Sequence, residues 1–247
     1  MRPYLAVIDF TMISVVVPAY NEEKEITRCL TALAQQKTGR EFEVVVVDNA
    51  STDATAQAAK EFLGKLSLTI IFEEQKGRGA ARAAGFKAAR GEIILSTDAD
   101  TAVPPNWVEN LASGLVQSKA VAVAGSMTVT GCGKMATAAF NFIQPLTARL
   151  YRVLFGHYWP GGYNFAIYKD VYQRAGGFNP KLNAMEDTDL GFRVKKIGKI
   201  RFLPKVIVQF SGRRFEKRLI PGLVDYVVQF LNYYFGREKG TYLSDVR

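Results

Sequence analysis

Two aspartates spaced i, i+2, Asp98 and Asp100, follow the apolar run Ile93-Ile94-Leu95 almost directly. On an extended backbone their carboxylates point roughly the same way, and they repel each other unless a cation lies between or beside them. Carboxylate oxygens select Mg²⁺ or Mn²⁺, which keep several waters and also bind substrate phosphates. The pair therefore predicts a divalent-metal site for a phosphate-bearing substrate; a polar loop before Pro104-Pro105 is the alternative.

A second acidic group opens the predicted helix that starts near Met185. Glu186 and Asp187 stand at its very start, where a carboxylate can protrude into a cleft and act as a general base. Acidic residues in a first helical turn also favour the helix dipole, and that effect alone explains Asp189.

Polar residues follow two further apolar runs, as Pro18-Ala19-Tyr20-Asn21-Glu22 and as Asp48 to Asp53. Helix N-caps account for Asn21 and for one of the residues Ser51 to Asp53, but not for Asp48. A third loop, Lys76 to Arg82, carries two glycines before a predicted helix. It is interpreted either as a phosphate site, with Lys76 and the helix N-terminus favouring the charge, or as a basic turn.

The elements that must position these residues are short apolar runs alternating with helical stretches. The runs begin at Ile13, Val44, Leu68 and Ile93. This alternation predicts an α/β fold with an open, mostly parallel sheet covered by helices on both faces. Ligands of such sheets bind beyond the carboxyl ends of the strands, where the polar residues lie. A Walker loop and a glycine-rich turn after the first strand are both missing from the sequence.

Composition excludes several other classes of protein. The chain has 247 residues, 48% of them hydrophobic and 22% charged, with two cysteines and one histidine. Disorder, collagen, a disulfide scaffold and a histidine-based zinc site are therefore excluded. Cysteine usage suggests a reducing compartment and a cytoplasmic location. No apolar run is long enough to predict a membrane span.

The net charge of +9 lies entirely in residues 193–247, which hold 13 basic and 4 acidic side chains. Within this part, residues 219–236 predict an amphipathic helix with a wide apolar face and basic flanks, and residues 135–155 form a second such segment. These features favour peripheral attachment to an anionic membrane surface at its cytoplasmic face. A buried or dimer-forming helix is the alternative. No nucleic-acid-binding motif is found.

Six segments in order resemble glycosyltransferase family 2: Val17 to Glu22, Val47 to Asp53, Lys76 to Arg82, Asp98 to Asp100, Gly176 to Phe178, and Glu186-Asp187. The resemblance covers residues 12–210 and implies a GT-A fold that divides into a nucleotide-sugar half, 12–103, and an acceptor half, 104–210. Residues 1–11 would be an N-terminal extension, and residues 211–247 a basic amphipathic tail. The implied reaction is an inverting transfer from a UDP- or GDP-sugar.

The resemblance also implies roles for individual residues. Asp187 would be the general base, with Glu186 beside it, and Mn²⁺ or Mg²⁺ would be bound by Asp100 with Asp98 at or near the metal. The remaining residues would line the nucleotide-sugar site: Pro18, Ala19, Tyr20, Glu22, Asp48, Lys76, Asp98 and Ala99.

Two departures from related enzymes bear on the type of acceptor and on the number of sugars transferred. Polyprenyl-phosphate glycosyltransferases need no base, so the pair Glu186-Asp187 favours a hydroxyl acceptor on a saccharide or a lipid-linked saccharide. Processive synthases carry Q-x-x-R-W, whereas residues 209–215 have one residue too many and end in Phe215, so a single sugar addition is expected. A polyprenyl-phosphate glycosyltransferase and a non-catalytic membrane- or partner-binding protein remain alternatives.

Overall fold

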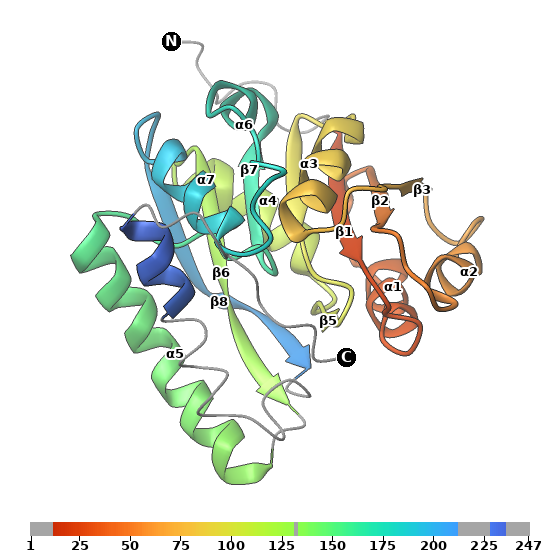
Figure 1. The fold of residues 1–247 in the computed structure, drawn as a ribbon, viewed down its shortest axis with the longest axis horizontal. Helices are drawn as coiled ribbons and strands as arrows, with labels where there is room; N and C mark the ends of the chain where they lie inside the picture. Colours follow the sequence, from red (N-terminus) through yellow and green to blue (C-terminus); the bar gives the residue numbers. More distant parts are fainter. Residues whose placement is uncertain (1–11, 131–132, 212–227, 236–247) are drawn as a thin grey trace.

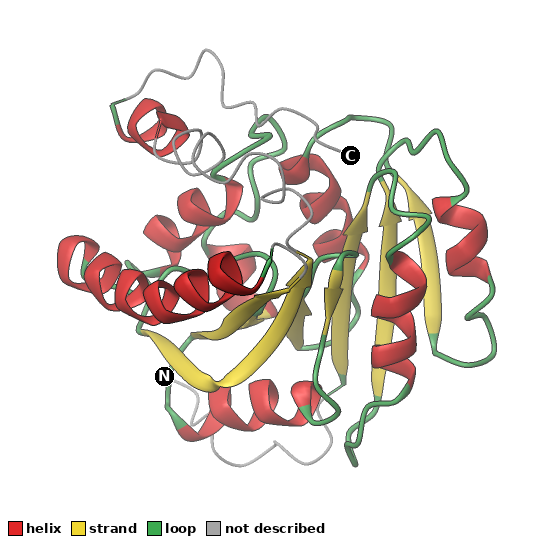
Figure 2. Ribbon diagram, turned by 90° about the horizontal axis from the view of Figure 1, so that it is seen from below, coloured by secondary structure: helices red, strands yellow, loops and turns green. Residues whose placement is uncertain are grey.

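The computed structural model describes residues 12–130, 133–211 and 228–235 (Figure 1). Its eight-stranded open sheet has the order β3-β2-β1-β4-β7-β6-β8-β5. Figure 2 shows the sheet with helices on either side of it. The predicted α/β class is therefore confirmed. The predicted extension, residues 1–11, lies outside the described residues.

The first half is an alternation of parallel strands and helices. The four predicted apolar runs form β1 (Ile13–Ala19), β2 (Phe42–Asp48), β3 (Leu68–Phe72) and β4 (Ile93–Ser96). These four strands pair with one another in parallel only. The intervening helices are α1 (Ile26–Ala34), α2 (Thr55–Lys60) and α3 (Arg78–Ala88).

The second half mixes strand directions. β7 runs antiparallel to both β4 and β6, β6 is parallel to β8, and β5 is antiparallel to β8. Parallel pairing thus dominates only among β1 to β4. The elements are β5 (Thr101–Ala102), α4 (Trp107–Gln117), β6 (Ala122–Thr130), α5 (Lys134–Phe155), β7 (Phe165–Tyr168), α6 (Lys169–Arg174), α7 (Glu186–Val194) and β8 (Ile200–Ser211).

Two apolar layers cover the sheet because successive strand residues point to opposite faces. Val15 and Val17 pack in one layer with α1, α2 and α4, whereas Val16 packs in the other with α3, α6 and α7. The central strands are buried on both sides, which explains why their sequences are continuous apolar runs. Such a frame holds the strand ends rigidly for a site.

A buried asparagine fixes the start of β7 beside the later strands. Asn164 donates through Nδ2 to the carbonyl oxygens of Ser126 (2.7 Å) and Val206 (2.9 Å), where the β6–β8 register shifts. Its Oδ1 accepts from Trp107 Nε1 at 2.8 Å. These bonds fix the position of the chain just after the turn Gly161-Gly162. The peptide groups of Gly162 in turn bond to two residues of the candidate site.

α5 is long, contains Pro145 and packs on β6. Residues 228–234 form a short helix within the predicted amphipathic segment 219–236, and Phe155 contacts Phe230 and Tyr234 at ring-centroid distances of 5.3 and 6.1 Å. Residues 219–227, most of the rest of that segment, lie outside the described residues. Among the helices described, none combines the length and apolarity needed to cross a bilayer.

Candidate active site

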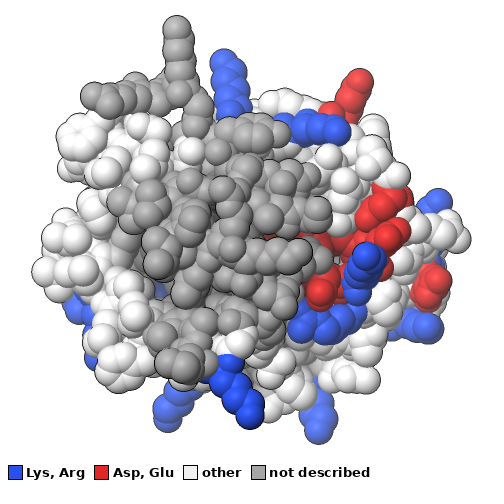
Figure 3. Space-filling view, turned by 60° about the horizontal axis from the view of Figure 1, so that its bottom comes forward, with Lys and Arg blue, Asp and Glu red and all other residues white. Residues whose placement is uncertain are grey.

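The predicted donor-side residues meet at one edge of the sheet. Ala19 and Asp48 are partners in the β1–β2 register, and Ser96, two residues before Asp98, pairs with Val16 of β1. This edge comes forward in Figure 3, where acidic side chains gather in one area with Lys and Arg side chains around them. Pro18 is the next-to-last residue of β1, whereas Glu22 and Ala99 lie in the strand-end loops and are buried.

Side chains of the strand-end loops bond mainly to one another. Asn21 accepts at Oδ1 from the Thr52 backbone N–H at 2.8 Å, and its own N–H donates to Ser51 Oγ at 3.0 Å. α1 begins only at Ile26, so the predicted N-cap role of Asn21 is wrong. The Asn21 side chain accepts instead from the neighbouring strand-end loop, because the two loops lie side by side.

Asp48 and Lys76 both lie in this region, Asp48 as the last residue of β2 and Lys76 in the loop between β3 and α3. Asp48 is buried and accepts at Oδ1 from the Ser51 backbone N–H at 3.1 Å. Lys76 Nζ lies 3.5 Å from the Tyr20 hydroxyl and 5.1 Å from the centroid of the Tyr20 ring. Tyr20 and Lys76 are therefore together at the sheet edge, as the sequence predicts.

The glycine loop before α3 serves packing in this structure. The N–H groups of Gly77, Arg78 and Gly79 donate, respectively, to Asn49 Oδ1 (2.8 Å), Asn183 Oδ1 (3.1 Å) and the Leu182 carbonyl (2.9 Å). A Cβ on Gly79 would lie 2.3 Å from the Asn179 carbonyl oxygen. These three N–H groups are already used, so the phosphate interpretation of the helix start finds no support here.

Arg82 is a functional candidate that the sequence analysis missed. Its guanidinium is 4% exposed and donates to Asp98 Oδ1 at 2.6 Å and to Glu186 Oε1 at 3.1 Å. It also donates to Ser96 Oγ (2.8 Å) and to the Gly162 carbonyl (3.0 Å). The loop Lys76 to Arg82 had been singled out, but only the folded chain reveals that its last residue is buried between acids.

The predicted acid pair lies at the N-terminus of α7 and is buried. Asp187 accepts at Oδ2 from the Gly162 N–H (3.0 Å) and at Oδ1 from the Thr188 N–H (2.7 Å). Burial, and then the neighbouring Glu186, raise the pKa of Asp187 to about 6, while the Gly162 N–H and Arg82 oppose the rise. A carboxyl group with this pKa is suited to proton transfer near neutral pH.

Aromatic side chains line the surroundings of Asp187. The Trp159 indole N–H also lowers the pKa of Asp187, although it makes no hydrogen bond of ordinary geometry within the described residues. Burial, and then Asp187, raise the pKa of the Tyr151 hydroxyl. Trp159 and Tyr151 therefore lie close to Asp187.

The residues present fit a divalent cation held jointly with substrate. No group of three His, Cys, Asp or Glu side chains forms a ready metal site in the part of the chain that the structure describes. One oxygen of Asp98 is paired with Arg82, and Asp100, the predicted metal ligand, lies two residues further along the same loop. Arg28 donates to the Asp100 carbonyl at 2.8 Å and fixes the turn. One carboxylate suffices when substrate phosphates and waters complete the coordination.

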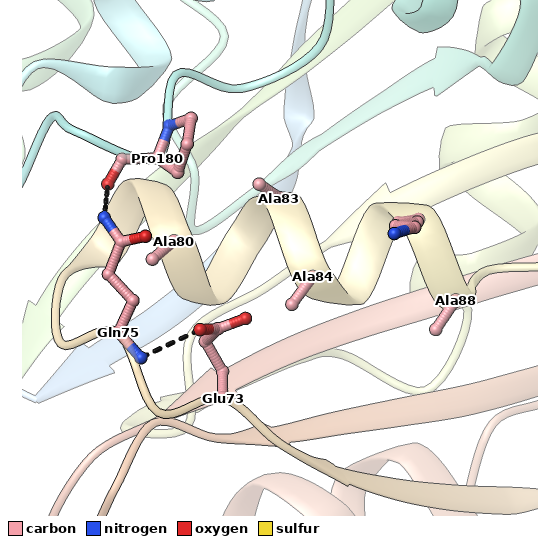
Figure 4. Close-up of a pocket in the computed structure, with 8 residues that line it drawn as sticks. Glu73, Gln75, Ala80, Ala83, Ala84, Ala88 and Pro180 are labelled. Atoms are coloured by element: carbon pink, nitrogen blue, oxygen red, sulfur yellow. Dashed lines mark hydrogen bonds between the residues drawn. The ribbon is translucent and has the colours of Figure 1, made fainter.

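A separate groove of about 520 Å³ runs along the outer side of α3 (Figure 4). Small residues of α3, such as Ala80 and Ala84, form one wall of the groove. At one end of the groove, Gln75 Nε2 donates to the Pro180 carbonyl (2.8 Å). None of the predicted site residues lines this groove. The predicted site therefore lies at the strand ends, away from this groove.

Residues 14–175, more than half of the chain, match the family model of Glycosyl transferase family 2. The chain belongs to this family. Among curated proteins, the chain is 32% identical to the probable glycosyltransferase YdaM of Bacillus subtilis over 79% of its own length and 49% of YdaM. It is 37% identical to the undecaprenyl-phosphate 4-deoxy-4-formamido-L-arabinose transferase of Pseudomonas aeruginosa over 47% of the chain and 35% of that protein.

Solved structures confirm the GT-A fold of this family member. The mannosyltransferase PcManGT from Pyrobaculum calidifontis, in complex with GDP-Man and Mn²⁺, has a TM-score of 0.72 and 25% identity, covering 92% of the chain and 64% of PcManGT. TarS 1-349 of S. aureus, in complex with UDP-GlcNAc, has a TM-score of 0.68 and 24% identity, covering 90% of the chain and 66% of the TarS 1-349 chain. The chain spans about half the length of YdaM and about a third of the arabinose transferase.

Proposed function

We propose that this family member is a glycosyltransferase that moves one sugar from a UDP- or GDP-sugar to a hydroxyl acceptor, with inversion at the anomeric carbon. One observation carries the proposal. The donor-side carboxylate of Asp98 and the buried acid pair Glu186-Asp187 are bonded, directly or through Gly162, to a single guanidinium. Solved structures with this fold include complexes with UDP-GlcNAc and with GDP-Man and Mn²⁺, which supports a nucleotide sugar as donor.

In the proposed reaction the acceptor oxygen attacks the anomeric carbon, and the bond from that carbon to the diphosphate oxygen breaks. Asp187 takes the proton of the attacking hydroxyl at its carboxylate, and Glu186 stays nearby and paired with Arg82. Asp48, Tyr20 and Lys76 bind the nucleoside part of the donor, with Pro18, Ala19, Glu22 and Ala99 shaping that site. Asp100 would hold Mn²⁺ or Mg²⁺, which offsets the charge of the departing diphosphate.

The electrostatics at Asp187 favour a neutral acceptor. Two carboxyl groups are buried next to each other there, and the nearby guanidinium already bonds to both halves of the site. An anionic acceptor would be repelled by these carboxylates. The similarity to an undecaprenyl-phosphate transferase keeps a polyprenyl-phosphate acceptor as the second candidate. A base-deficient Asp187→Asn variant separates the two, because only a hydroxyl acceptor needs the base.

A thermal-shift panel of UDP, GDP, dTDP and CMP, each with and without Mn²⁺, tests the donor site. We expect one diphosphate to raise the melting temperature in a Mn²⁺-dependent way, because ligand that binds only the folded state stabilises it by mass action. A concentration 100 times the dissociation constant corresponds to about 2.7 kcal/mol. If every nucleotide leaves the melting temperature unchanged, the chain is a folded relative without donor binding.

We further propose that α5 rests on an anionic membrane surface, which would give access to a lipid-linked saccharide. Large apolar side chains on α5 are exposed, including Phe142 (75%), Leu150 (57%) and Val153 (79%). Lys134, Arg149 and Arg152 are the charged residues of this helix, which contains no acid. Such a basic, apolar face is typical of helices that lie in a membrane surface, where each basic residue adds about 1 kcal/mol.

Co-sedimentation with vesicles tests this membrane proposal. At low salt we expect binding to anionic vesicles and none to neutral ones, and Leu150→Asp should abolish it. Leu63→Asp is the matched control, because Leu63 is equally exposed (56%) and lies on the far side of the sheet from α5. This substitution should leave vesicle binding unchanged. Equal loss in both variants, or no binding by the unaltered protein, would reject a membrane-facing role for α5.

A further inference from the structure

Every nitrogen of the Arg82 side chain is bonded to a different part of the active site. Nη2 donates to Asp98 Oδ1 (2.6 Å) after β4, and Nε donates to Glu186 Oε1 (3.1 Å) at the start of α7. Nη1 donates both to Ser96 Oγ (2.8 Å) and to the Gly162 carbonyl (3.0 Å). A planar guanidinium presents its donors in fixed directions, so these partners are held at set positions relative to one another.

The peptide groups of Gly162 extend this arrangement to Asp187. The Gly162 carbonyl accepts from Arg82, and the Gly162 N–H donates to Asp187 Oδ2 at 3.0 Å. A Cβ at this position would lie 2.3 Å from Arg82 Nη2, so only glycine lets the guanidinium approach. Arg82 therefore acts on the proposed base through one residue as well as through Glu186.

We propose that Arg82 is a positioning residue that sets the donor-side carboxylate of Asp98 and the acceptor-side base Asp187 in one fixed arrangement. This inference rests on the glycosyl transfer proposed above. Arg82 touches neither donor nor acceptor in this scheme, and its effect passes through Asp98, Glu186 and Gly162. A displacement of about 1 Å in such groups is enough to lower a rate about 10²-fold.

The alternative is an ion pair that only stabilises the fold, and the chain contains a matched example of one. Arg90 bonds to the buried Glu43 through Nε and Nη2, both at 2.7 Å from Oε2. Glu43 is 1% exposed and lies near the start of β2, at the end of the sheet opposite the site. Arg90→Lys therefore perturbs a comparable buried carboxylate without reaching the active site.

The first experiment compares Arg82→Lys with Arg90→Lys. Release of nucleoside diphosphate is measured with the donor that the thermal-shift panel selects, and melting temperatures are recorded for both variants. Lysine keeps the charge, but its single nitrogen cannot occupy the separate positions from which Nε, Nη1 and Nη2 donate. We therefore expect kcat of folded Arg82→Lys to fall about 10²-fold, with the donor KM changed much less. Arg90→Lys should keep the kcat of the unaltered protein. Equal kcat in the two variants would overturn the proposal.

A second measurement needs no turnover. The chain has two tryptophans, and Trp107 is fully buried with its N–H bonded to Asn164, which leaves Trp159 to sense Asp187. The described groups whose charge or dipole acts on Asp187 are Glu186 of α7, Arg82 of α3, Tyr151 of α5, and the Gly162, Thr188 and Trp159 N–H groups. The fluorescence of Trp159 should titrate with the ionisation of Asp187 and lose that transition in Asp187→Asn.

In Arg82→Met we expect the midpoint of this transition to move to higher pH, because the positive charge that opposes protonation is gone. Arg82→Lys, which keeps the charge, should shift it less. An unchanged midpoint in Arg82→Met would overturn the positioning role. If the unaltered protein releases diphosphate from no donor, the proposed function fails, and this midpoint still decides whether Arg82 acts on Asp187.

Discussion

Asp187→Asn is expected to lower kcat about 10²–10⁴-fold, the usual contribution of general-base assistance. The amide has nearly the shape of the carboxyl group but cannot accept the proton of an attacking hydroxyl. Asp187 accepts from the N–H groups of Gly162 and Thr188, so the substitution leaves the donor-side loops in place. Nucleotide affinity in the thermal-shift assay should therefore stay unchanged while turnover falls.

Asp189→Asn is the matched control for this substitution. Asp189 lies in the first turn of the same helix, but it bonds to Arg193 and to the Tyr233 hydroxyl. It should keep kcat within a fewfold of the unaltered protein. An Asp187→Asn variant that retains full activity would point to an acceptor that needs no base, such as a polyprenyl phosphate.

As pH rises, the ionisation of Asp187 should increase kcat and decrease the stability of the folded protein. The base works only when ionised, so kcat should fall about tenfold per pH unit below a pKa of about 6. Because the folded state raises this pKa from 3.8, it binds the proton more tightly than the unfolded state. The stability contribution is therefore present at low pH and lost as pH rises from about 4 to 6, by about 3 kcal/mol at most. Asp187→Asn should accordingly raise the melting temperature at pH 7.5 and change it little at pH 4.

Asp100→Asn is expected to cost more than loss of the base, because cation binding and stabilisation of the departing diphosphate fail together. We expect the Mn²⁺-dependent thermal shift to vanish and turnover to drop to the level of protein treated with a chelator. Adding Mn²⁺ back should restore the treated unaltered protein and not the variant.

Asp170→Asn serves as the control for Asp100→Asn, since Asp170 is a surface residue of α6 near Arg174. Its Mn²⁺-dependent shift should equal that of the unaltered protein. A full thermal shift in Asp100→Asn would move the metal role to another residue or remove it from the mechanism.

The donor-side edge could be predicted from the sequence because parallel strands bring their carboxyl ends together. Once the runs before Pro18, Asp48 and Asp98 are identified as strands, their polar residues must converge, and the structure places them so. Tyr20 and Lys76 follow the same logic. Local patterns were sufficient here because each polar group lies within a few residues of the strand that carries it.

Arg82 could not be predicted in the same way. Its helix has the composition of a surface helix, and its partners Gly162 and Glu186 come from elements much later in the chain. The same limit explains the wrong N-cap role of Asn21 and why the sequence left the glycine loop open between a phosphate site and a basic turn. Asn21 bonds across to Thr52, and the N–H of Gly79 bonds to Leu182, because tertiary neighbours replaced the local partners that short-range patterns assume.

The guanidinium of Arg82 bonds to residues from both halves of the domain, and this matters when segments are exchanged between related proteins. Arg82, Ser96 and Asp98 belong to the first half of the domain, whereas Gly162 and Glu186 belong to the second. A chimera that joins the donor half of one relative to the acceptor half of another must preserve all five together. In the proposed scheme, exchange of either half therefore succeeds only where these five residues match across the junction.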